Sequence, residues 1–275
     1  MKKIFFAFVA LLALSACVKD GMYPNPTVSN ISNTVAYYDT DDVTVTATVS
    51  AFVNITKVNL VYNIGSAAAK EIAMTASGST YTATIPAASM GTEVKYYIEA
   101  FTEGGSAKSA VGSYKVGEVP ADYSKIKLNE LNGNDKFIEL INTGSEAVPI
   151  KGMTILKDSK ADPTWEGGNY VMKAGEILLL WSEDVACDAD GSALAGYDLE
   201  FVFHSGLSAK KAVRIELKDP KGNDVDDFNL VTVAKTAPAS YSRVPDGTGA
   251  WCYTAATPGA KNATDNSDPV TGFAE

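Results

Sequence analysis

Apolar and polar residues alternate with a period of two through most of the first half of the chain. In residues 43–49 valine and alanine occupy the odd positions and threonine the even ones, and residues 80–85 and 94–100 repeat the alternation. A period of two places every second side chain on the same face of a strand, and one-sided burial is typical of antiparallel sheets. The pattern therefore predicts an antiparallel β-sandwich over residues 28–117.

The second half has shorter apolar runs joined by tight turns. Residues 126–131, 137–142 and 177–181 are each predicted as a strand, and Gly and Pro residues supply the turns between them. These runs predict a second all-β domain over residues 125–263. A break in both patterns places a linker at residues 118–124, and the polar, acidic residues 264–275 are predicted to form a mobile tail.

The start of the chain follows neither pattern. Two lysines precede an apolar run over residues 4–14, which is too short for a bilayer core that needs about 20 residues, and small residues follow it. Residues 1–16 are therefore predicted to be an export signal that is removed. Residues 17–27 contain Gly21, Pro24 and Pro26 without periodicity and are expected to form a flexible tether.

Leu14-Ser15-Ala16-Cys17 resembles the lipobox of bacterial lipoproteins. The resemblance implies cleavage before Cys17 and its acylation, and two or more acyl chains would anchor the protein stably. An ordinary secretory signal with Cys17 as an incidental thiol is the alternative. Residues 18–20 resemble the surface-export signals of Bacteroidota lipoproteins, although too little of that pattern is present to choose a leaflet. The expected location is the cell envelope, as an outer-membrane lipoprotein whose surface exposure is left open.

Two further resemblances concern the predicted sandwiches. Residues 81–86 and 94–100 resemble bacterial immunoglobulin-like or fibronectin-like modules. A longer series, in the same order as in the family, resembles the lamin-tail domain, and it implies a second immunoglobulin-like sandwich from Lys125 to about Ala263. The motifs are Asn129-Glu130, Phe137–Asn142, Ile150–Gly152, Lys173–Glu176, Gly206–Ser208, Val213–Asp219, Gly222–Asp227, Ser242–Gly247 and Ala256–Asn262. The expected fold class is all-β, with two immunoglobulin-like antiparallel β-sandwich domains in tandem.

Charge and cysteine content narrow the function. The formal net charge is −10, and removal of two lysines with residues 1–16 leaves about −12, so nucleic acid is not an expected partner. With Cys17 acylated, Cys187 and Cys252 remain, and in an oxidising compartment an even remainder predicts a disulfide between them. Two separate buried thiols are the alternative.

The sequence contains few candidates for catalysis. The sequence has no Gly-x-Ser-x-Gly motif whose serine its one histidine, His204, would activate. One histidine and two cysteines are also too few ligands for a zinc site. Glu130 and Glu139 lie on neighbouring predicted strands, where paired carboxylates could hydrolyse glycosides, but both belong to the lamin-tail-like motifs. The expectation is a protein that is not an enzyme, with a hydrolase whose site escapes motif reading as the alternative from another class.

Binding residues are sought in the loops. Trp165 is the candidate ligand-binding residue, because it lies in a polar loop where an indole could stack on a sugar; plugging the end of the sandwich is its structural alternative. Trp181 is expected in the core, and Trp251 is expected to pack on the disulfide of the adjacent Cys252. No cofactor or metal is expected, with calcium at two acidic clusters left open. The clusters are Asp39, Asp41 and Asp42, and Asp188 with Asp190.

These expectations combine into one hypothesis. The chain is predicted to be a lipid-anchored binding or scaffolding protein of the cell envelope. Its partners would be the membrane, through the acyl chains, and an unidentified protein or glycan. A surface glycan-binding lipoprotein that uses Trp165 is the alternative within binding proteins.

Overall fold

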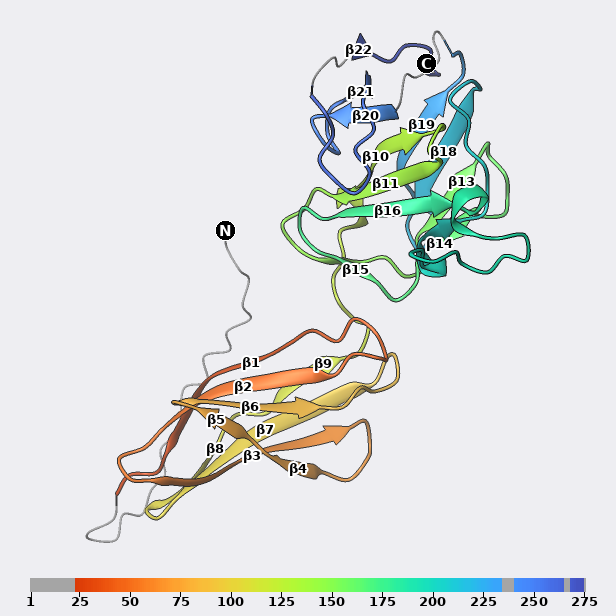
Figure 1. Ribbon diagram of the computed structural model, residues 1–275. Coiled ribbons are helices and arrows are strands. Elements are labelled where there is room, and N and C mark those ends of the chain that lie inside the picture. The colour runs from red at the N-terminus through yellow and green to blue at the C-terminus, as the bar shows by residue number, and fades with distance from the viewer. Residues whose placement is uncertain (1–22, 234–239, 265–267, 275) are drawn as a thin grey trace. The chain divides into compact units, whose positions relative to one another are not determined.

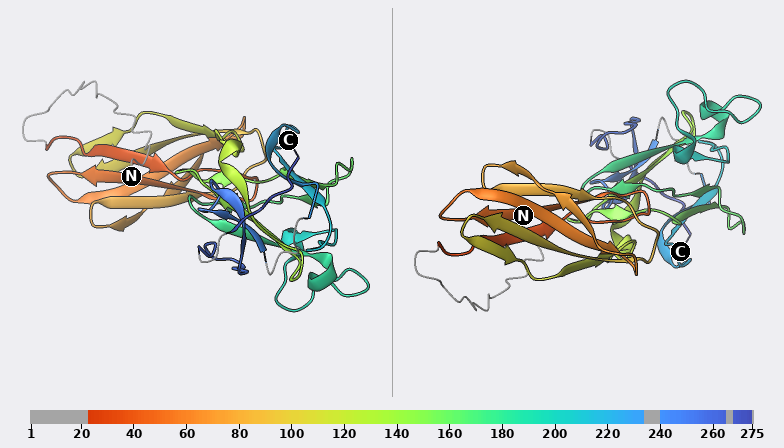
Figure 2. Two further views of the ribbon diagram at one scale, coloured as in Figure 1. Left: turned by 90° about the horizontal axis from the view of Figure 1, so that it is seen from above. Right: turned by 90° about the horizontal axis from the view of Figure 1, so that it is seen from below.

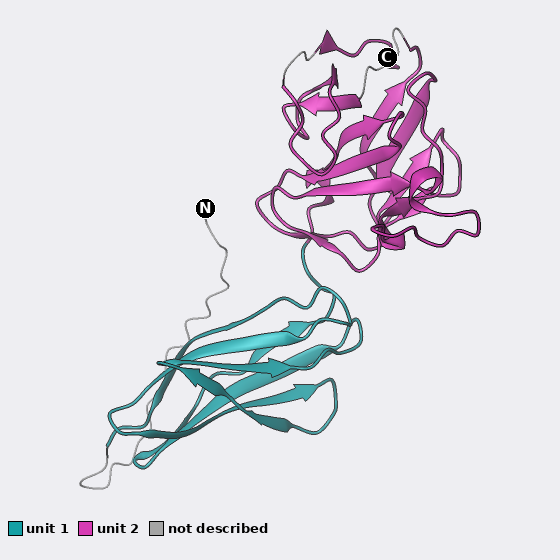
Figure 3. Ribbon diagram, in the orientation of Figure 1, with its two compact units in different colours: residues 1–120 teal, residues 121–275 magenta. Residues whose placement is uncertain are grey.

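The computed structural model describes residues 23–233, 240–264 and 268–274. The chain divides into two compact units, residues 1–120 and 121–275 (Figure 3). This division falls inside the interval 118–124, where the sequence places a linker. The predicted signal peptide and Cys17 lie outside the described residues. Within those residues, no helix combines the length and the apolar character that a bilayer crossing requires.

Unit 1 consists of two antiparallel sheets (Figure 1). One sheet has the strand order β1-β2-β6-β5, and the other has the order β4-β3-β7-β8 with β9 also paired to β7. The strands run along the length of the unit, so the connecting loops collect at its two ends (Figure 2). The strands are β1 (Thr27–Asn33), β2 (Val43–Ser50), β3 (Ile55–Ile64), β4 (Lys70–Ala73), β5 (Thr75–Ser77), β6 (Thr80–Ile85), β7 (Glu93–Thr102), β8 (Gly105–Lys108) and β9 (Gly112–Lys115).

The predicted alternation is confirmed in the core of unit 1. Every odd residue of β2 is buried and the even residues are partly or fully exposed, and in β7 Val94, Ile98 and Ala100 are fully buried. Side chains from both sheets meet in one apolar cluster that includes Val45 and Leu60. Each buried aliphatic side chain of this size contributes roughly 1.5–3 kcal/mol to folding. The period of two therefore produces a sandwich because each sheet has one apolar face to cover.

The chain enters unit 1 at one end and leaves at the other. At the entry end, Thr27 of β1 pairs with Ser50, the last residue of β2, and the β3 residue Ile55 pairs with Thr102, the last residue of β7. Four segments lie there: residues 23–26, the loop 51–54, the turn 78–79 and the turn 103–104. At the exit end, the first residue of β7 pairs with Lys115, the last residue of β9. The ten residues of β7 span about 33 Å between these ends.

Unit 2 has a seven-stranded sheet, a four-stranded sheet and a short two-stranded one. Their strand orders are β17-β16-β11-β10-β20-β21-β22, β14-β13-β18-β19 and β12-β15 (Figure 1). The elements are η1 (Tyr123–Lys125), β10 (Ile126–Asn132), β11 (Phe137–Asn142), β12 (Val148–Pro149), β13 (Thr154–Lys157), β14 (Trp165–Glu166), β15 (Val171–Met172), β16 (Ile177–Ser182), α1 (Glu183–Ala186), η2 (Leu199–Phe201), β17 (Val202–Phe203), β18 (Val213–Lys218), β19 (Asp224–Leu230), β20 (Ser240–Val244), β21 (Ala250–Thr254) and β22 (Asp268–Pro269).

The two larger sheets of unit 2 enclose one apolar core. Leu128 and Leu140 of the seven-stranded sheet belong to the same cluster as Ile215, Leu217 and Phe228 of the four-stranded sheet. The predicted all-β fold class is therefore confirmed. The central strands β10 and β11 are covered on both faces, because all six residues of β11 and all but one residue of β10 are buried. The second face of β10 and β11 is covered by the segment around residues 257–262, whose N–H groups bond to both strands.

The expected mobile tail is wrong for residues 268–274. β22 pairs with β21, and the backbone N–H groups of Val231 and Thr232 both donate to the carbonyl of Gly272. Phe273 packs edge-on against Phe228 with ring centroids 5.2 Å apart, and Val270 is 8% exposed. Composition alone suggested a tail because polar residues dominate it, whereas two apolar side chains and the backbone pairing of this segment fix it to unit 2.

Candidate functional site

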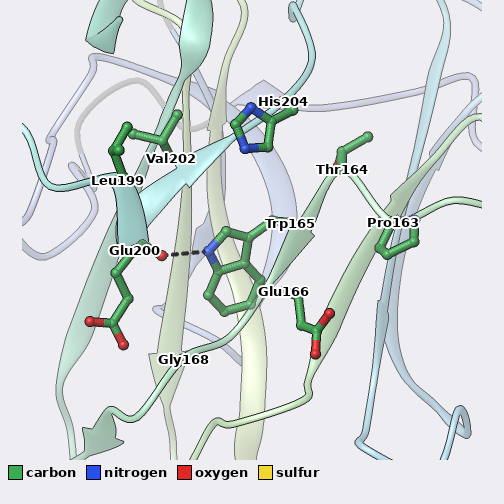
Figure 4. Close-up of a pocket in the computed structure, with 9 residues that line it drawn as sticks. All are labelled: Pro163, Thr164, Trp165, Glu166, Gly168, Leu199, Glu200, Val202 and His204. Carbon is green, nitrogen blue, oxygen red and sulfur yellow. Dashed lines mark hydrogen bonds between the residues drawn. The ribbon is translucent and has the colours of Figure 1, made fainter. Parts of the chain in front are cut away.

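An open pocket of about 340 Å³ lies where β14 and β17, the edge strands of the two larger sheets, come together, and Figure 4 shows the residues that line it. Backbone bonds hold its walls together: Thr164 N–H donates to the carbonyl of Ile155, and His204 N–H donates to that of Thr164 at 2.7 Å. β14, η2 and β17 thereby converge on one place. The lining residues are Pro163, Thr164, Trp165, Glu166, Gly168, Leu199, Glu200, Val202 and His204.

Trp165 forms the floor of this pocket and does not project from it. Its side chain belongs to the core cluster and the residue is only 3% exposed. The indole Nε1–H donates to the carbonyl of Glu200 at 3.0 Å (Figure 4). The expectation of an exposed indole ready to stack on a sugar is therefore wrong. Polar neighbours in the sequence suggested a loop tip, but the short pairing of β13 with β14 turns this side chain inward.

Glu200 and His204 supply polar groups at the rim of the pocket. Glu200 Oε1 is buried against Gly168 and accepts no hydrogen bond from the part of the chain that the structure describes. The side chain of His204 is 66% exposed, and its Nδ1 lies 3.0 Å from Glu183 Oε2. This pair lies at the surface. Among the described residues, the side-chain hydrogen-bond partner of His204 is Glu183, and not a serine or cysteine that His204 would activate as a nucleophile.

Glu130 and Glu139 form a buried pair on β10 and β11. They are direct cross-strand partners, and both residues have no exposed surface. The N–H of Thr257 donates to Glu130 Oε1 at 3.1 Å, and the N–H of Gly259 donates to Glu139 Oε1 at 2.6 Å. Burial, together with a smaller effect of the charge of Glu130, raises the pKa of Glu139 to about 8, although the hydrogen bond from Gly259 acts to lower it. Both carboxyl groups therefore fasten a turn to the sheet.

A set of amide and charged side chains extends this buried frame. Asn262 Nδ2 donates to the carbonyl of Arg243 at 2.8 Å and to both oxygens of Asn129 at 3.1 Å. The N–H of Asn262 donates to Asp246 Oδ1 at 2.9 Å. Arg243 pairs with Asp226 at 2.9 Å. These residues belong to the lamin-tail-like motifs, but the motifs alone did not predict a hydrogen-bond network. Polar residues inside otherwise apolar strands, such as Asn129, were the signal that such a network exists.

The predicted disulfide is wrong, because Cys187 and Cys252 are free thiols. Cys187 follows α1, which continues from β16, whereas Cys252 lies in β21. Three strands separate β16 from β21 in the sheet, so these two strands lie about 19 Å apart at the usual strand spacing. A disulfide needs Cα atoms within about 7 Å. The alternative of two separate buried thiols is correct for Cys252, whereas Cys187 is a separate thiol that is only partly buried. Trp251 packs on Phe228 with ring centroids 4.8 Å apart instead of on a disulfide.

The acidic clusters satisfy the hydrogen-bond donors of their own loops. Asp188 and Asp190 both accept from the N–H of Ser192, and Asp41 accepts from two successive backbone N–H groups. Asp42 accepts from the N–H of Ala87 at 2.8 Å. Across residues 23–233, 240–264 and 268–274, no group of three or more His, Cys, Asp or Glu side chains is arranged to hold a metal ion.

Two family models match this chain. The Lamin Tail Domain model matches residues 120–232, which contain β10–β19, and the model of the prokaryotic membrane lipoprotein lipid attachment site matches residues 1–17. These matches identify a lipoprotein lipid attachment site and a lamin-tail-like domain, which has an immunoglobulin-like fold, in the matched parts of this chain. The match ends at residue 232, so β20, β21 and the turn at residues 257–259 that covers Glu130 and Glu139 lie beyond it.

Solved structures give only remote likenesses. A chimeric titin Z1Z2 functionalized with a KLER exogenous peptide from decorin is 12% identical, with 75% of this chain and 93% of that chain covered and a TM-score of 0.30. A GH family 64 laminaripentaose-producing beta-1,3-glucanase from Paenibacillus barengoltzii is 14% identical over 74% of this chain and 58% of its own, with a TM-score of 0.25. At these scores neither likeness supports an argument about activity. A search of curated proteins returned no match.

Proposed function

We propose that this protein is a lipid-anchored, non-catalytic binding or scaffolding protein of the cell envelope, in which unit 1 spaces unit 2 from the membrane. The observation that carries the proposal is the path of the chain through unit 1. The lipid attachment site precedes the entry end, and the linker to unit 2 follows the exit end. A sandwich crossed from end to end in this way serves as a spacer of about 33 Å.

The absence of catalysis is part of the proposal, and the arrangement of the ionisable groups supports it. A general acid or nucleophile must reach a substrate. Glu130 and Glu139 instead have no exposed surface and bond to the backbone of residues 257 and 259. His204 has Glu183 as its partner at an exposed site, without the enclosure that strengthens electrostatic catalysis. We also propose that function needs no cofactor, because the oxygens of the acidic loops are engaged by backbone N–H groups.

We place the partner-binding surface of unit 2 at this pocket. Leu199, which is 50% exposed, lines the pocket, and Leu194, five residues earlier in the chain, is 43% exposed. Apolar side chains among polar rim groups are the composition that protein interfaces favour. A partner protein in the envelope is the occupant we propose. The outer membrane is the membrane that we propose for the anchor, and nucleic acid is not a proposed partner because the chain is strongly acidic.

Site-specific crosslinking in the native host tests this assignment. A photoreactive amino acid replaces Leu199 in the full anchored chain, and Lys221, which is exposed in the turn between β18 and β19, is replaced in a matched control. Discrete protein adducts from position 199 alone are the expected result, and equal adducts from both positions would contradict the proposal. Separation of inner and outer membranes reports the location. A hydrolase screen tests non-catalysis, since turnover abolished by His204→Ala would show an enzyme.

Glycan binding at the same pocket is the second candidate. It is favoured by one observation: Glu200 lines the pocket, and its buried Oε1 has no hydrogen-bond partner among the described residues, so a small movement of this side chain would offer the oxygen to a sugar hydroxyl. Trp165 is a weak probe of this idea because its substitution would disturb the core. A glycan array with the parent chain and Glu200→Gln is the sharper test, with Glu146→Gln, an exposed residue away from the pocket, as the control. Signals lost only in Glu200→Gln would favour a glycan partner.

A further inference from the structure

The entry end of unit 1 carries two exposed aromatic side chains. Phe52, in the loop between β2 and β3, is 82% exposed, and Tyr23 is 58% exposed. Phe52 has the largest exposed fraction of all large apolar residues in the described part of the chain. Tyr23 lies against Gly104 of the turn between β7 and β8, which ends at the same side of the unit. Neither residue belongs to the apolar core of unit 1.

The lipid attachment site limits the distance between the entry end of unit 1 and the membrane. Tyr23 is the sixth residue after Cys17, and six residues of fully extended chain reach at most about 20 Å. The residues that follow Tyr23 are already fixed in unit 1, since Asn25 packs on Gly105 and Thr27 begins β1. Acylation at Cys17 therefore keeps the entry end, rather than the exit end about 33 Å away, next to the lipid surface.

The chemistry of the entry end matches the interface of a bilayer. Aromatic rings are enriched where hydrocarbon meets headgroups, because one ring holds an apolar body and tolerates a polar surrounding. The nearby charges do not form a basic patch: Lys57 is paired with Glu71 at 2.7 Å, and Glu103 in the neighbouring turn is an exposed acid. Contact with lipid would therefore come from apolar insertion and not from attraction to anionic headgroups.

We propose that the entry end of unit 1 rests on the membrane surface, with the Phe52 side chain inserted among the lipids and Tyr23 at the headgroup level. The occupant of this surface is a phospholipid bilayer. The contact adds a second attachment point to the acyl chains and turns the exit end of unit 1 away from the bilayer. It depends on acylation at Cys17 and not on a partner of unit 2, so crosslinking at Leu199 can fail without affecting it.

Fluorescence of the acylated full-length protein in phosphatidylcholine vesicles tests the contact. Phe52→Trp is compared with Val35→Trp, an exposed apolar position in the loop at the exit end, and the parent chain supplies the background of native tryptophans. The added emission of Phe52→Trp is expected to shift to shorter wavelength and to be quenched by brominated acyl chains. Emission from Val35→Trp is expected to stay unquenched. Equal quenching at the two positions, or none at position 52, would overturn the proposal.

Two further measurements do not depend on a new tryptophan. Amide hydrogen exchange in residues 51–54 of the acylated parent chain is expected to slow on vesicles, and Phe52→Ser is expected to abolish that protection. Exchange that is equally fast with and without vesicles would contradict insertion. Quenching should also persist when salt is raised to about 1 M, where the Debye length falls to about 3 Å. Loss of quenching in salt would show an electrostatic encounter instead of insertion.

Discussion

Glu130 and Glu139 lie directly opposite each other on β10 and β11, and each accepts a backbone N–H from the same turn at residues 257–259. The pair stabilises the closure of the C-terminal segment over the sheet, but the burial of two neighbouring carboxyl groups has a cost in free energy. The hydrogen bonds from the turn offset part of this cost.

The stability of unit 2 should fall as pH rises from about 5 through about 8. Burial raises the pKa of Glu139 from 4.5 to about 8, so between these values the folded state holds a proton that the unfolded state has lost. Stability falls with pH wherever the folded state binds more protons, so this contribution is complete below pH 4.5 and is lost above pH 8. Urea unfolding of the mature chain at a series of pH values measures it.

Glu139→Gln keeps the shape of the side chain and cannot ionise. The variant should lose most of the pH dependence and be more stable than the parent chain above pH 8. Glu103→Gln, at an exposed turn, is the control and should keep the profile of the parent chain. An unchanged slope in Glu139→Gln would assign the pH dependence to other groups.

Trp165→Ala should destabilise unit 2 by about 3–5 kcal/mol, because it removes a large side chain from the core. Trp165→Phe keeps much of the apolar volume and removes the hydrogen bond to the Glu200 carbonyl, so its cost should be nearer 1 kcal/mol for that bond, plus a small loss of packing. Denaturant unfolding measures both. If Trp165→Ala were as stable as the parent chain, the indole would not be the floor of the pocket.

Removal of residues 268–275 should destabilise unit 2 by roughly 3 kcal/mol, because it uncovers the Phe228 ring and returns Val270 and Phe273 to water. A mobile tail could be removed without effect, so the truncation separates the two descriptions. Phe273→Ala is the matched point variant and should show part of the same loss. The free energy of unfolding from urea titrations is the measurement.

Thiol titration of the mature chain, unfolded without reductant, should count two thiols, because Cys187 and Cys252 are free and a thioether at Cys17 does not react. Cys187→Ser should lower the count to one. In the folded protein Cys252 should react more slowly than Cys187, since burial raises the pKa of its thiol. A count of zero in the unfolded parent chain would restore the disulfide.

The alternation of apolar and polar residues is sufficient by itself to predict the β-sandwich of unit 1. Val43 and Val45, with threonine between them, lie on the buried face of β2 as the period of two requires. The lamin-tail-like motifs likewise predicted the fold of unit 2, and the family match over residues 120–232 confirms the motifs that lie in this range. These features are local in the sequence, and short-range periodicity is sufficient to read them because it reflects which face of a strand meets the core.

Tertiary structure decided what depends on distant segments meeting. The burial of Glu139 depends on a turn 120 residues further along the chain, and the inward orientation of Trp165 depends on Glu200, 35 residues away. Composition could not reveal that three strands separate β16, which precedes Cys187, from β21, which contains Cys252, or that Phe273 returns to Phe228. Such contacts are set by the order of the strands in a sheet. Long loops allow this order to differ from the order of the strands in the sequence.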